Sequence, residues 1–165
     1  GQHIISGSFD KLVKVWSVAT KSLVSTCGRK DNKDPSIGHN DDVMAVAPTP
    51  DGQRILSGAR DKTVRVWLLD DNYSIPWPHT FEKTFSELHT HWVTALVVLP
   101  DNQHALSGSG GGELKLFNFN DGAVLRKFKY YSGPEVCLAL LPDGRRFVCG
   151  SVERTNLVEH GLAPQ

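Results

Sequence analysis

The stretches GQHIISGSFDKLVKVW at residues 1–16 and GQRILSGARDKTVRVW at residues 52–67 align without a gap and decide the fold. A third stretch, NQHALSGSGGGELKLF at residues 102–117, keeps the same frame. A fourth, GRRFVCGSVERTNLVE at residues 144–159, keeps only its skeleton. Four copies in one register indicate a chain that is built from repeats.

The spacing of the copies predicts the kind of repeat. Trp16 and Trp67 are 51 residues apart, Trp67 and Phe117 are 50 apart, and Asp101 and Asp143 are 42 apart. The shortest spacing approximates the basic unit, and the longer two indicate insertions. Because a period of about 40–45 residues is typical of four-stranded propeller blades, the sequence predicts a propeller.

Within each repeat the local pattern predicts strands. Mostly apolar runs, typical of strands that are buried on both faces, occupy residues 43–47, 93–99 and 136–141. Each run is followed by a Pro-Asp-Gly or Pro-Asp-Asn turn, a second strand, a polar turn and a strand of alternating apolar and polar residues. A fourth, more polar strand fits residues 22–27, 79–86 and 123–129. Since no stretch has a capped helical period, the chain is expected to be all-β.

Composition and charge narrow the function classes. The 165 residues include 18 Lys and Arg against 18 Asp and Glu, and 39% are hydrophobic. A neutral balance argues against direct nucleic-acid binding or anionic-membrane binding, because both need a basic surface. The sequence has no run of 18 apolar residues, so no membrane span is expected. Its three cysteines form no CxxC pair, which favours a reduced, intracellular compartment, the cytoplasm or the nucleus.

These features resemble the WD-repeat β-propellers along nearly the whole chain. The residues that carry the resemblance are Gly38-His39, Pro50-Asp51-Gly52, Ser57-Gly58, Asp61 and Trp67. The resemblance implies about three and a half four-stranded blades, with fourteen strands in groups of three, four, four and three. The blades are expected at residues 1–27, 38–86, 88–129 and 134–159.

Such a partial propeller is not expected to close on itself, because propellers contain roughly four to eight blades and closure removes the exposed edges. The chain also begins at Gly1 rather than at Met. We therefore expect part of a seven- or eight-bladed propeller, whose remainder is supplied in cis by a longer chain or in trans by a partner.

In the family, His, Ser or Thr, Asp and Trp form a hydrogen-bonded tetrad within each blade. Blade two has the full set: His39, Ser57, Asp61 and Trp67. Blade one keeps Ser6, Asp10 and Trp16, and blade three keeps His89 and Ser107. The positions that depart from the pattern hold Gly111 and Phe117 in blade three and Cys149, Glu153 and Glu159 in blade four. These sets are expected to be structural, because buried polar groups have to satisfy one another.

Three constellations that suggest chemistry have a structural explanation that we favour. The His, Ser and Asp of the tetrad are the residue types of a hydrolase triad, but they recur with the blade frame. The GSGGG run at residues 108–112 falls at a blade turn, and no GK[ST] motif follows it as a phosphate site requires. His89 and His91 have no third ligand at metal spacing. We therefore expect no catalytic residue, no cofactor and no metal.

Two cysteines could also react with each other. Cys137 and Cys149 fall on adjacent strands of one expected hairpin, where they could face each other. Reduced packing residues are favoured over a disulfide in an intracellular protein.

The resemblance places partner contacts on one face of the propeller, called the top face. The positions precede the tetrad Asp or flank the start of an inner strand: Phe9, Arg60, Gly110, Asp42, Met44, Trp92 and Thr94. Exposed Trp and Arg side chains often dominate binding energy. Arg60 is the strongest candidate, because an arginine in a turn is expected to have little structural work. For Trp92, exposure on this face and packing beneath a neighbouring loop are both open.

Two insertions separate the repeats. Residues 28–37, GRKDNKDPSI, carry mixed charges and are expected to form a solvated loop. Residues 70–78, DDNYSIPWP, lie on the opposite face, and the presence of Tyr73 and Trp77 among prolines suits a docking loop.

These expectations favour a non-catalytic protein–protein interaction scaffold or adaptor in a multi-subunit complex. The alternative is a regulatory or targeting propeller of a larger enzyme or signalling protein, whose catalytic domain lies outside this chain. A propeller hydrolase ranks last, because it needs carboxylates on the inner strands and only Glu135 lies near the start of one.

Overall fold

The computed structural model describes residues 2–28, 38–69, 81–129, 136–151 and 160–161. Over these ranges every regular element is a strand, and the strands number fourteen. Their bounds are β1 His3–Gly7, β2 Val13–Ser17, β3 Ser22–Cys27, β4 Val43–Pro48, β5 Arg54–Ala59, β6 Val64–Leu68, β7 Phe81–Phe85, β8 Val93–Val98, β9 His104–Ser109, β10 Glu113–Asn118, β11 Val124–Lys129, β12 Val136–Leu140, β13 Arg146–Ser151 and β14 His160–Gly161. This part of the chain has no helix that is long and apolar enough to cross a membrane.

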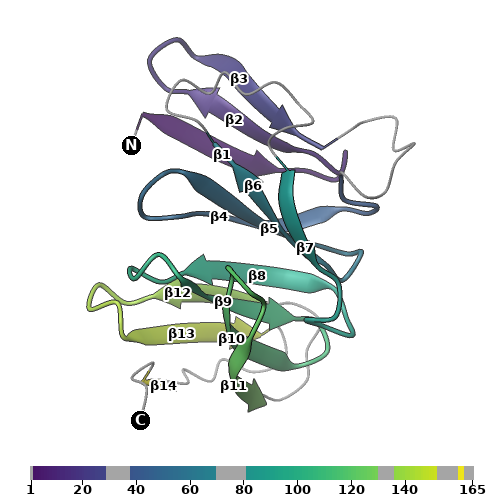
Figure 1. Ribbon diagram of the computed structural model, residues 1–165, viewed down its shortest axis with the longest axis vertical. Coiled ribbons are helices and arrows are strands. Elements are labelled where there is room, and N and C mark those ends of the chain that lie inside the picture. Colours follow the sequence, from purple (N-terminus) through teal and green to yellow (C-terminus); the bar gives the residue numbers. More distant parts are fainter. Residues whose placement is uncertain (1, 29–37, 70–80, 130–135, 152–159, 162–165) are drawn as a thin grey trace.

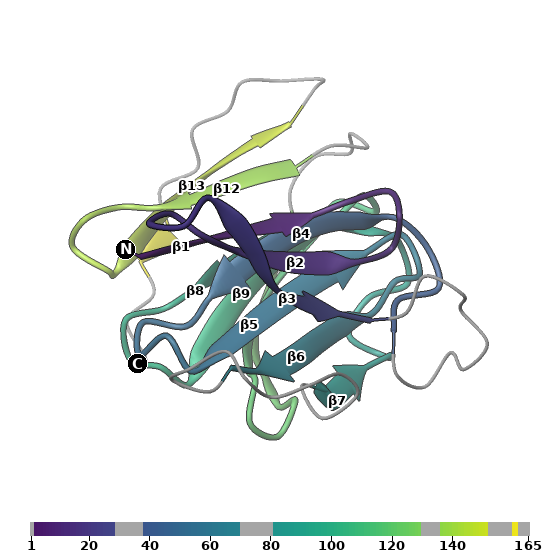
Figure 2. The same cartoon turned by 90° about the horizontal axis from the view of Figure 1, so that it is seen from above.

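The strands form four antiparallel sheets, and within each sheet the strands pair in chain order: β1 to β3, β4 to β7, β8 to β11 and β12 to β14. Figure 1 shows the four sheets following one another from the N-terminal to the C-terminal end of the molecule. Figure 2 shows β4, β5, β6 and β7 fanning out in order, as strands of a twisted blade do. The predicted all-β propeller fold is confirmed. The third strand of the last sheet, β14, lies just beyond residue 159.

One turn recurs between the first two strands of three sheets. The carboxylates of Asp51, Asp101 and Asp143 accept hydrogen bonds from the backbone N–H two residues later, at 2.9, 3.0 and 2.9 Å. The residue that follows each Asp has a positive φ of 72°, 60° and 65°, and Gly, Asn and Gly occupy it. The Pro-Asp-Gly/Asn motif therefore sets the length and register of each inner hairpin.

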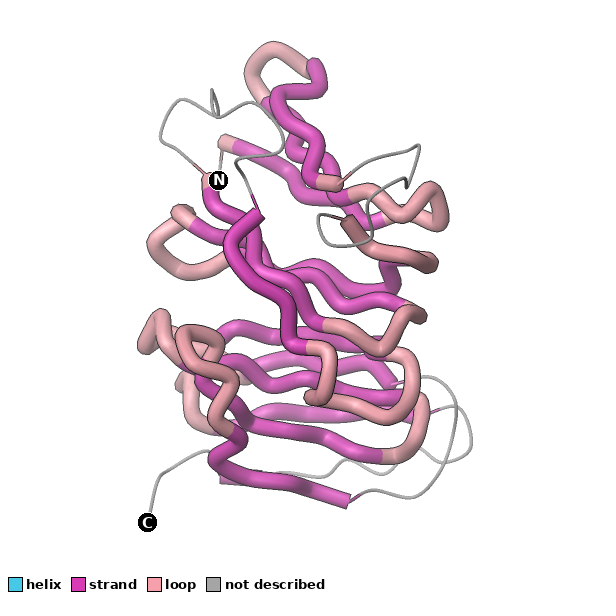
Figure 3. The backbone as a smooth tube through the Cα atoms, turned by 45° about the vertical axis from the view of Figure 1, so that its right-hand side comes forward, coloured by secondary structure: helices cyan, strands magenta, loops and turns pink. Residues whose placement is uncertain are grey.

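The sheets pack through a repeated close approach. A Cβ added to Gly7 of β1 would lie 2.6 Å from a methyl carbon of Val43 in β4, and one added to Gly58 of β5 would collide with Val93 of β8. Each glycine therefore allows the next inner strand to lie directly against it. The resulting core between the second and third sheets includes Leu56, Val64, Val66, Val93 and Phe117. Figure 3 shows that the turns and loops lie at two sides of this packed stack, with the strands between them.

The two cysteines of the last hairpin, which could have faced each other, do not. Cys137 pairs in register with Gly150, and Leu138 pairs with Cys149. Because side chains alternate along a strand, the one-residue offset sends the two thiols to opposite faces of the sheet. Cys149 is buried against the core, Cys137 is exposed, and both are free.

Candidate interaction face

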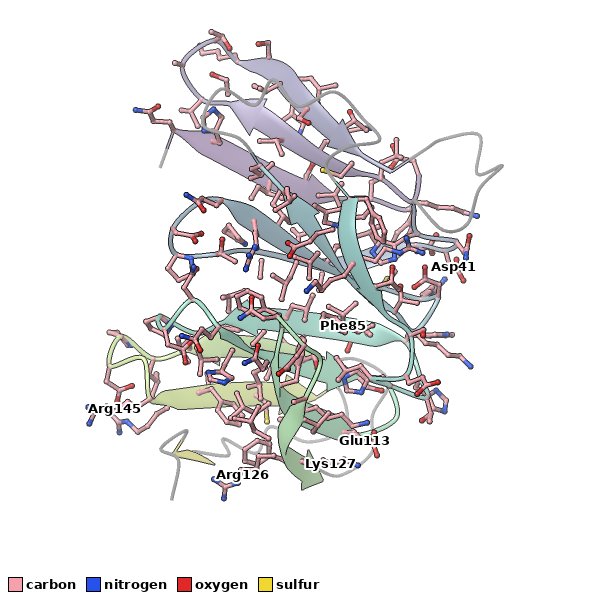
Figure 4. The ribbon with its side chains drawn as sticks, viewed as in Figure 1. Asp41, Phe85, Glu113, Arg126, Lys127 and Arg145 are labelled. Carbon is pink, nitrogen blue, oxygen red and sulfur yellow. The ribbon has the colours of Figure 1, made fainter. Side chains whose placement is uncertain are left out.

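One side of the stack carries the loops that lead into β4 and β8 and the turns β1–β2, β5–β6 and β9–β10. We call this side, at residues 8–12, 38–42, 59–63, 88–92 and 109–113, the top face. Figure 4 shows Asp41 and Glu113 on this side and Arg145, in the β12–β13 turn, on the opposite side.

A buried polar chain connects this face to the middle of blade two. The Trp67 indole N–H donates to Ser57 Oγ at 2.7 Å, and Ser57 Oγ lies 2.7 Å from His39 Nε2. On the other side of the ring, His39 Nδ1 lies 3.0 Å from Asp61 Oδ2, which also accepts from the Asn40 N–H at 2.8 Å. If His39 Nδ1–H donates to Asp61, the Ser57 hydroxyl donates to Nε2 and every member is satisfied.

The charges in this chain are fixed by burial and hydrogen bonds. Burial lowers the pKa of His39, against the opposing effect of the Asp61 carboxylate, so the ring is neutral at pH 7. Burial alone would raise the pKa of Asp61, but hydrogen bonds from His39, Thr63 and the Asn40 backbone lower it well below the usual range. The set is a neutral ring held by a carboxylate, and its Ser57 hydroxyl is fully buried. A buried hydroxyl is not placed to attack a substrate.

The tetrad positions of blade one are joined only in part. The Trp16 indole N–H donates to Ser6 Oγ at 2.9 Å. Asp10 accepts from the Leu12 N–H at 3.1 Å and pairs with Lys14 at 2.7 Å. Asp10 therefore shapes its own turn. At the corresponding positions of blade four, Cys149 is buried, whereas Glu153 and Glu159 lie outside the described residues.

In blade three a different carboxylate lies near the histidine, and His89 Nδ1 is buried without a hydrogen-bond partner among the described residues. His89 Nε2 lies 2.8 Å from Ser107 Oγ, as the equivalent pair does in blade two. Gly111 offers no carboxylate, and Glu113 Oε2 instead lies 4.0 Å from His89 Nδ1 and 3.1 Å from Lys115 Nζ. The Lys115 ammonium also donates to the Leu88 carbonyl. Burial lowers the pKa of His89 to about 4, and Lys115 adds to this effect.

Sequence reasoning missed Glu113 and Lys115. The signal was present, because the aligned repeats place Glu113 opposite Thr63 and Lys115 opposite Arg65. Neither residue stands at one of the four tetrad positions, which are the positions that the family resemblance marks.

Arg60 links two blades, so the expectation that it has little structural work is wrong. Its guanidinium Nη1 donates to Asp42 Oδ2 at 3.0 Å, and its Cζ lies 4.5 Å from the centre of the Trp92 ring. Its backbone N–H also donates to the Asp42 carbonyl at 2.8 Å. Trp92 belongs to the next blade and is 39% exposed, so its ring lies partly open to solvent and partly against Arg60.

The other expected contact residues vary in exposure. Phe9 is the most exposed large hydrophobic side chain in the described ranges, at 70%. Met44 and Thr94 are half-buried, and the Gly110 N–H donates to the Trp92 carbonyl at 2.9 Å. Tyr73 and Trp77 of the opposite-face loop lie outside the described residues, as do residues 29–37 of the first insertion.

The GSGGG run forms a turn like that of blade two. The Gly112 N–H donates to the Ser109 carbonyl at 3.0 Å, as the Lys62 N–H does to the Ala59 carbonyl at 3.1 Å. A Cβ on Gly111 would lie 3.0 Å from the ring of His91, which covers this turn. In the described ranges no three His, Cys, Asp or Glu side chains gather as a metal site would require.

Comparison with known proteins gives one family. The profile described as "WD domain, G-beta repeat" matches residues 1–17, 22–67 and 80–118. The small ribosomal subunit protein RACK1 of Drosophila melanogaster is 36% identical over 95 residues, which cover 54% of this chain and 28% of that protein. The kinesin-like protein KIF21A of Homo sapiens is 30% identical over 131 residues, which cover 79% of this chain and 7% of that protein.

A solved structure gives the same result. The WD40 β-propeller domain of Doa1 matches 95% of this chain and 49% of its own chain, with a TM-score of 0.69 and 29% sequence identity. This chain thus spans about half of that propeller chain and less than a third of either relative.

The buried chain in blade two generates a stability prediction. Replacing Asp61 by Ala leaves the His39 Nδ1 and the Asn40 N–H without their acceptor. We expect a loss of roughly 1–3 kcal/mol in the free energy of unfolding, measured by urea denaturation. The matched control is Glu87→Ala, which removes an exposed carboxylate with no hydrogen bond or ion pair among the described residues and is expected to cost within about 0.5 kcal/mol. Equal stability of the two variants would contradict the role of Asp61.

His89 generates a prediction of pH dependence. Its pKa is about 4 in the folded chain and about 6.5 when unfolded, so the unfolded state binds more protons between these values. The corresponding stability is fully present above pH 6.5 and is lost as the pH falls towards 4. Measured from pH 7 to pH 4, the wild type should lose up to roughly 3 kcal/mol more than His89→Gln. Ser107, Glu113 and Lys115 face this ring and are kept in both proteins. Identical pH profiles would refute the prediction.

Proposed function

The chain belongs to the WD40-repeat family of β-propeller proteins, and from that premise we propose that it acts as a non-catalytic scaffold or adaptor for proteins in a larger complex. The observation that carries the proposal is the top-face patch, which we define as Phe9, Asp42, Arg60 and Trp92. Its exposed aromatic rings and its cation are residue types that dominate protein interfaces.

The patch is suited to binding because its residues are held before a partner arrives. Arg60 is fixed by one carboxylate and one ring from two different blades. The turn that carries it is anchored by Asp61 and the buried chain beneath. A side chain that is already ordered loses little conformational entropy on binding, so more of the contact energy is retained as affinity.

The relatives support action within an assembly. One is named as a protein of the small ribosomal subunit. We propose that this chain likewise works in a multi-subunit complex inside the cell, in the cytoplasm or the nucleus. Its formal net charge of zero supports contact with proteins rather than directly with nucleic acid.

The blade division remains part of the proposal. We take blades one to four at residues 1–27, 38–86, 88–129 and 134–159 as about half of a seven- or eight-bladed propeller. The solved propeller chain of which this chain covers 49% supports that fraction.

A second candidate function is a regulatory or targeting module of a larger enzyme or signalling protein. The match to a kinesin-like protein supports it, because the matched segment is 7% of that protein. In that case the catalytic domain lies outside this chain, and the top-face patch still serves as the contact surface.

The patch is tested by removing its aromatic rings. We expect Phe9→Ala together with Trp92→Ala to reduce the proteins that co-purify with the tagged protein by at least about tenfold, because interface hot spots contribute 2 kcal/mol or more. Quantitative mass spectrometry measures the recovery. The control is Val18→Ala, which removes an exposed apolar side chain in the β2–β3 turn. Unchanged recovery in the double variant would exclude the top-face patch as the contact surface.

A further inference from the structure

A second surface lies between the outer strands of blades two and three. A hollow of about 400 Å³ opens there between the end of β7 and the β10–β11 turn. Its lining residues are Thr84, Phe85, Ser86, Glu87, Leu88, Asp121, Gly122 and Val124, and none of them belongs to the top-face patch. Phe85, at the end of β7, is marked in Figure 4.

The floor of the hollow is apolar and held in place. Phe85 stacks edge-on against Phe117 with ring centres 5.7 Å apart, and Leu88 is buried beside it. Val124 remains 39% exposed. Gly122 has a φ of 83°, and a Cβ there would lie 2.9 Å from the Phe85 ring. Glycine thus lets the turn lie directly against the ring without covering it further.

The turn beside the hollow is also ordered by the chain itself. Lys83 Nζ donates to the Asn120 carbonyl at 2.6 Å, which ties β7 to the turn. The Ala123 N–H donates to Asp121 Oδ1 at 2.8 Å, and the Gly122 N–H donates to the Asn118 carbonyl at 2.8 Å. The hollow is therefore formed before any ligand binds.

Negative charge borders this apolar floor. Glu87 and Asp121 are both exposed, and among the described residues neither carboxylate makes an ion pair. None of the residues that line the hollow is a lysine or an arginine. The nearby Lys83 ammonium contacts the Asn120 carbonyl and the Glu82 carboxylate, so it does not neutralise Glu87 or Asp121. An occupant with an apolar side chain beside a positive charge would complement both the floor and the border.

We propose that this hollow docks a segment of a partner protein in which an apolar side chain lies next to a lysine or an arginine. The apolar side chain covers Leu88, Phe85 and Val124, and the cation lies at Glu87 and Asp121. The open border, formed by exposed residues, favours a segment of a macromolecule over a small ligand, because small-ligand sites enclose most of the ligand. This surface is independent of the top-face patch.

The test uses short peptides as probes. The panel consists of ten tetrapeptides, Ac-Gly-X-Z-Gly-NH2, in which X is Lys or Arg and Z is Leu, Ile, Val, Phe or Trp. Each is titrated into the whole protein with labelled methyl groups, and the shifts of Leu88 and Val124 are followed by NMR. We expect saturable shifts with at least one peptide, and no saturation with its counterpart that has Glu at X.

Two variants test the acidic border and the apolar floor of the hollow separately. Glu87→Gln should weaken binding of that peptide by about three- to fivefold, because it removes one exposed charge pair. Val124→Asn, which changes no charge, should remove the saturable shift of Leu88. The control Gln2→Lys changes the net charge by the same amount as Glu87→Gln, on an exposed residue next to β1 in the first sheet, and should leave the affinity within about twofold. Backbone spectra verify that each variant is folded.

Three outcomes would overturn the proposal. They are an absence of saturable shifts with all ten peptides, equal binding of the Glu counterpart, and unchanged binding to Glu87→Gln. Trp92→Ala should bind the peptide like the wild type, so failure here is separate from failure of the top-face patch.

Discussion

The structure depends on the buried hydrogen-bonded chain from Trp67 through Ser57 and His39 to Asp61. It joins the middle of a sheet to the loop before β4 and to the turn after β5. Arg60 directly precedes Asp61, and Asp42 lies three residues after His39; both belong to the top-face patch. If one member lost its partner, a buried polar group would be left unpaired and the free energy of unfolding would fall. The complete chain is therefore favoured, and it holds the top face above it in place.

Blade three shows that the frame tolerates a different solution. His89 and Ser107 keep their contact, whereas Glu113 and Lys115 supply the charges that Asp61 and Arg65 supply in blade two. The carboxylate is farther from the ring and the histidine is held neutral mainly by burial. Two blades can thus have the same backbone with different electrostatics, which leaves the top face free to vary in charge from blade to blade.

The fold could be predicted from the sequence because the repeat fixes both strand order and turn type. Contacts between blades could not. The Arg60–Trp92 stack and the hollow between residues 84–88 and 121–124 join segments that no local pattern relates. The orientation of Cys137 and Cys149 depended on a register offset of one residue, which pairing of strands alone does not specify. Strands, turns and tetrad contacts within a blade were therefore predictable, because the repeat determines them, whereas contacts between neighbouring blades depend on how the blades pack.

Amide hydrogen exchange tests most directly whether the buried chain holds the top face. The Arg60 N–H donates to the Asp42 carbonyl in blade two, and the Gly110 N–H donates to the Trp92 carbonyl in blade three, so the two amides are matched probes. In Asp61→Asn the account predicts faster exchange at Arg60 and unchanged exchange at Gly110, because only one of the two turns loses its anchor. Unchanged exchange at both amides would contradict it, since the face would then be ordered without the buried chain.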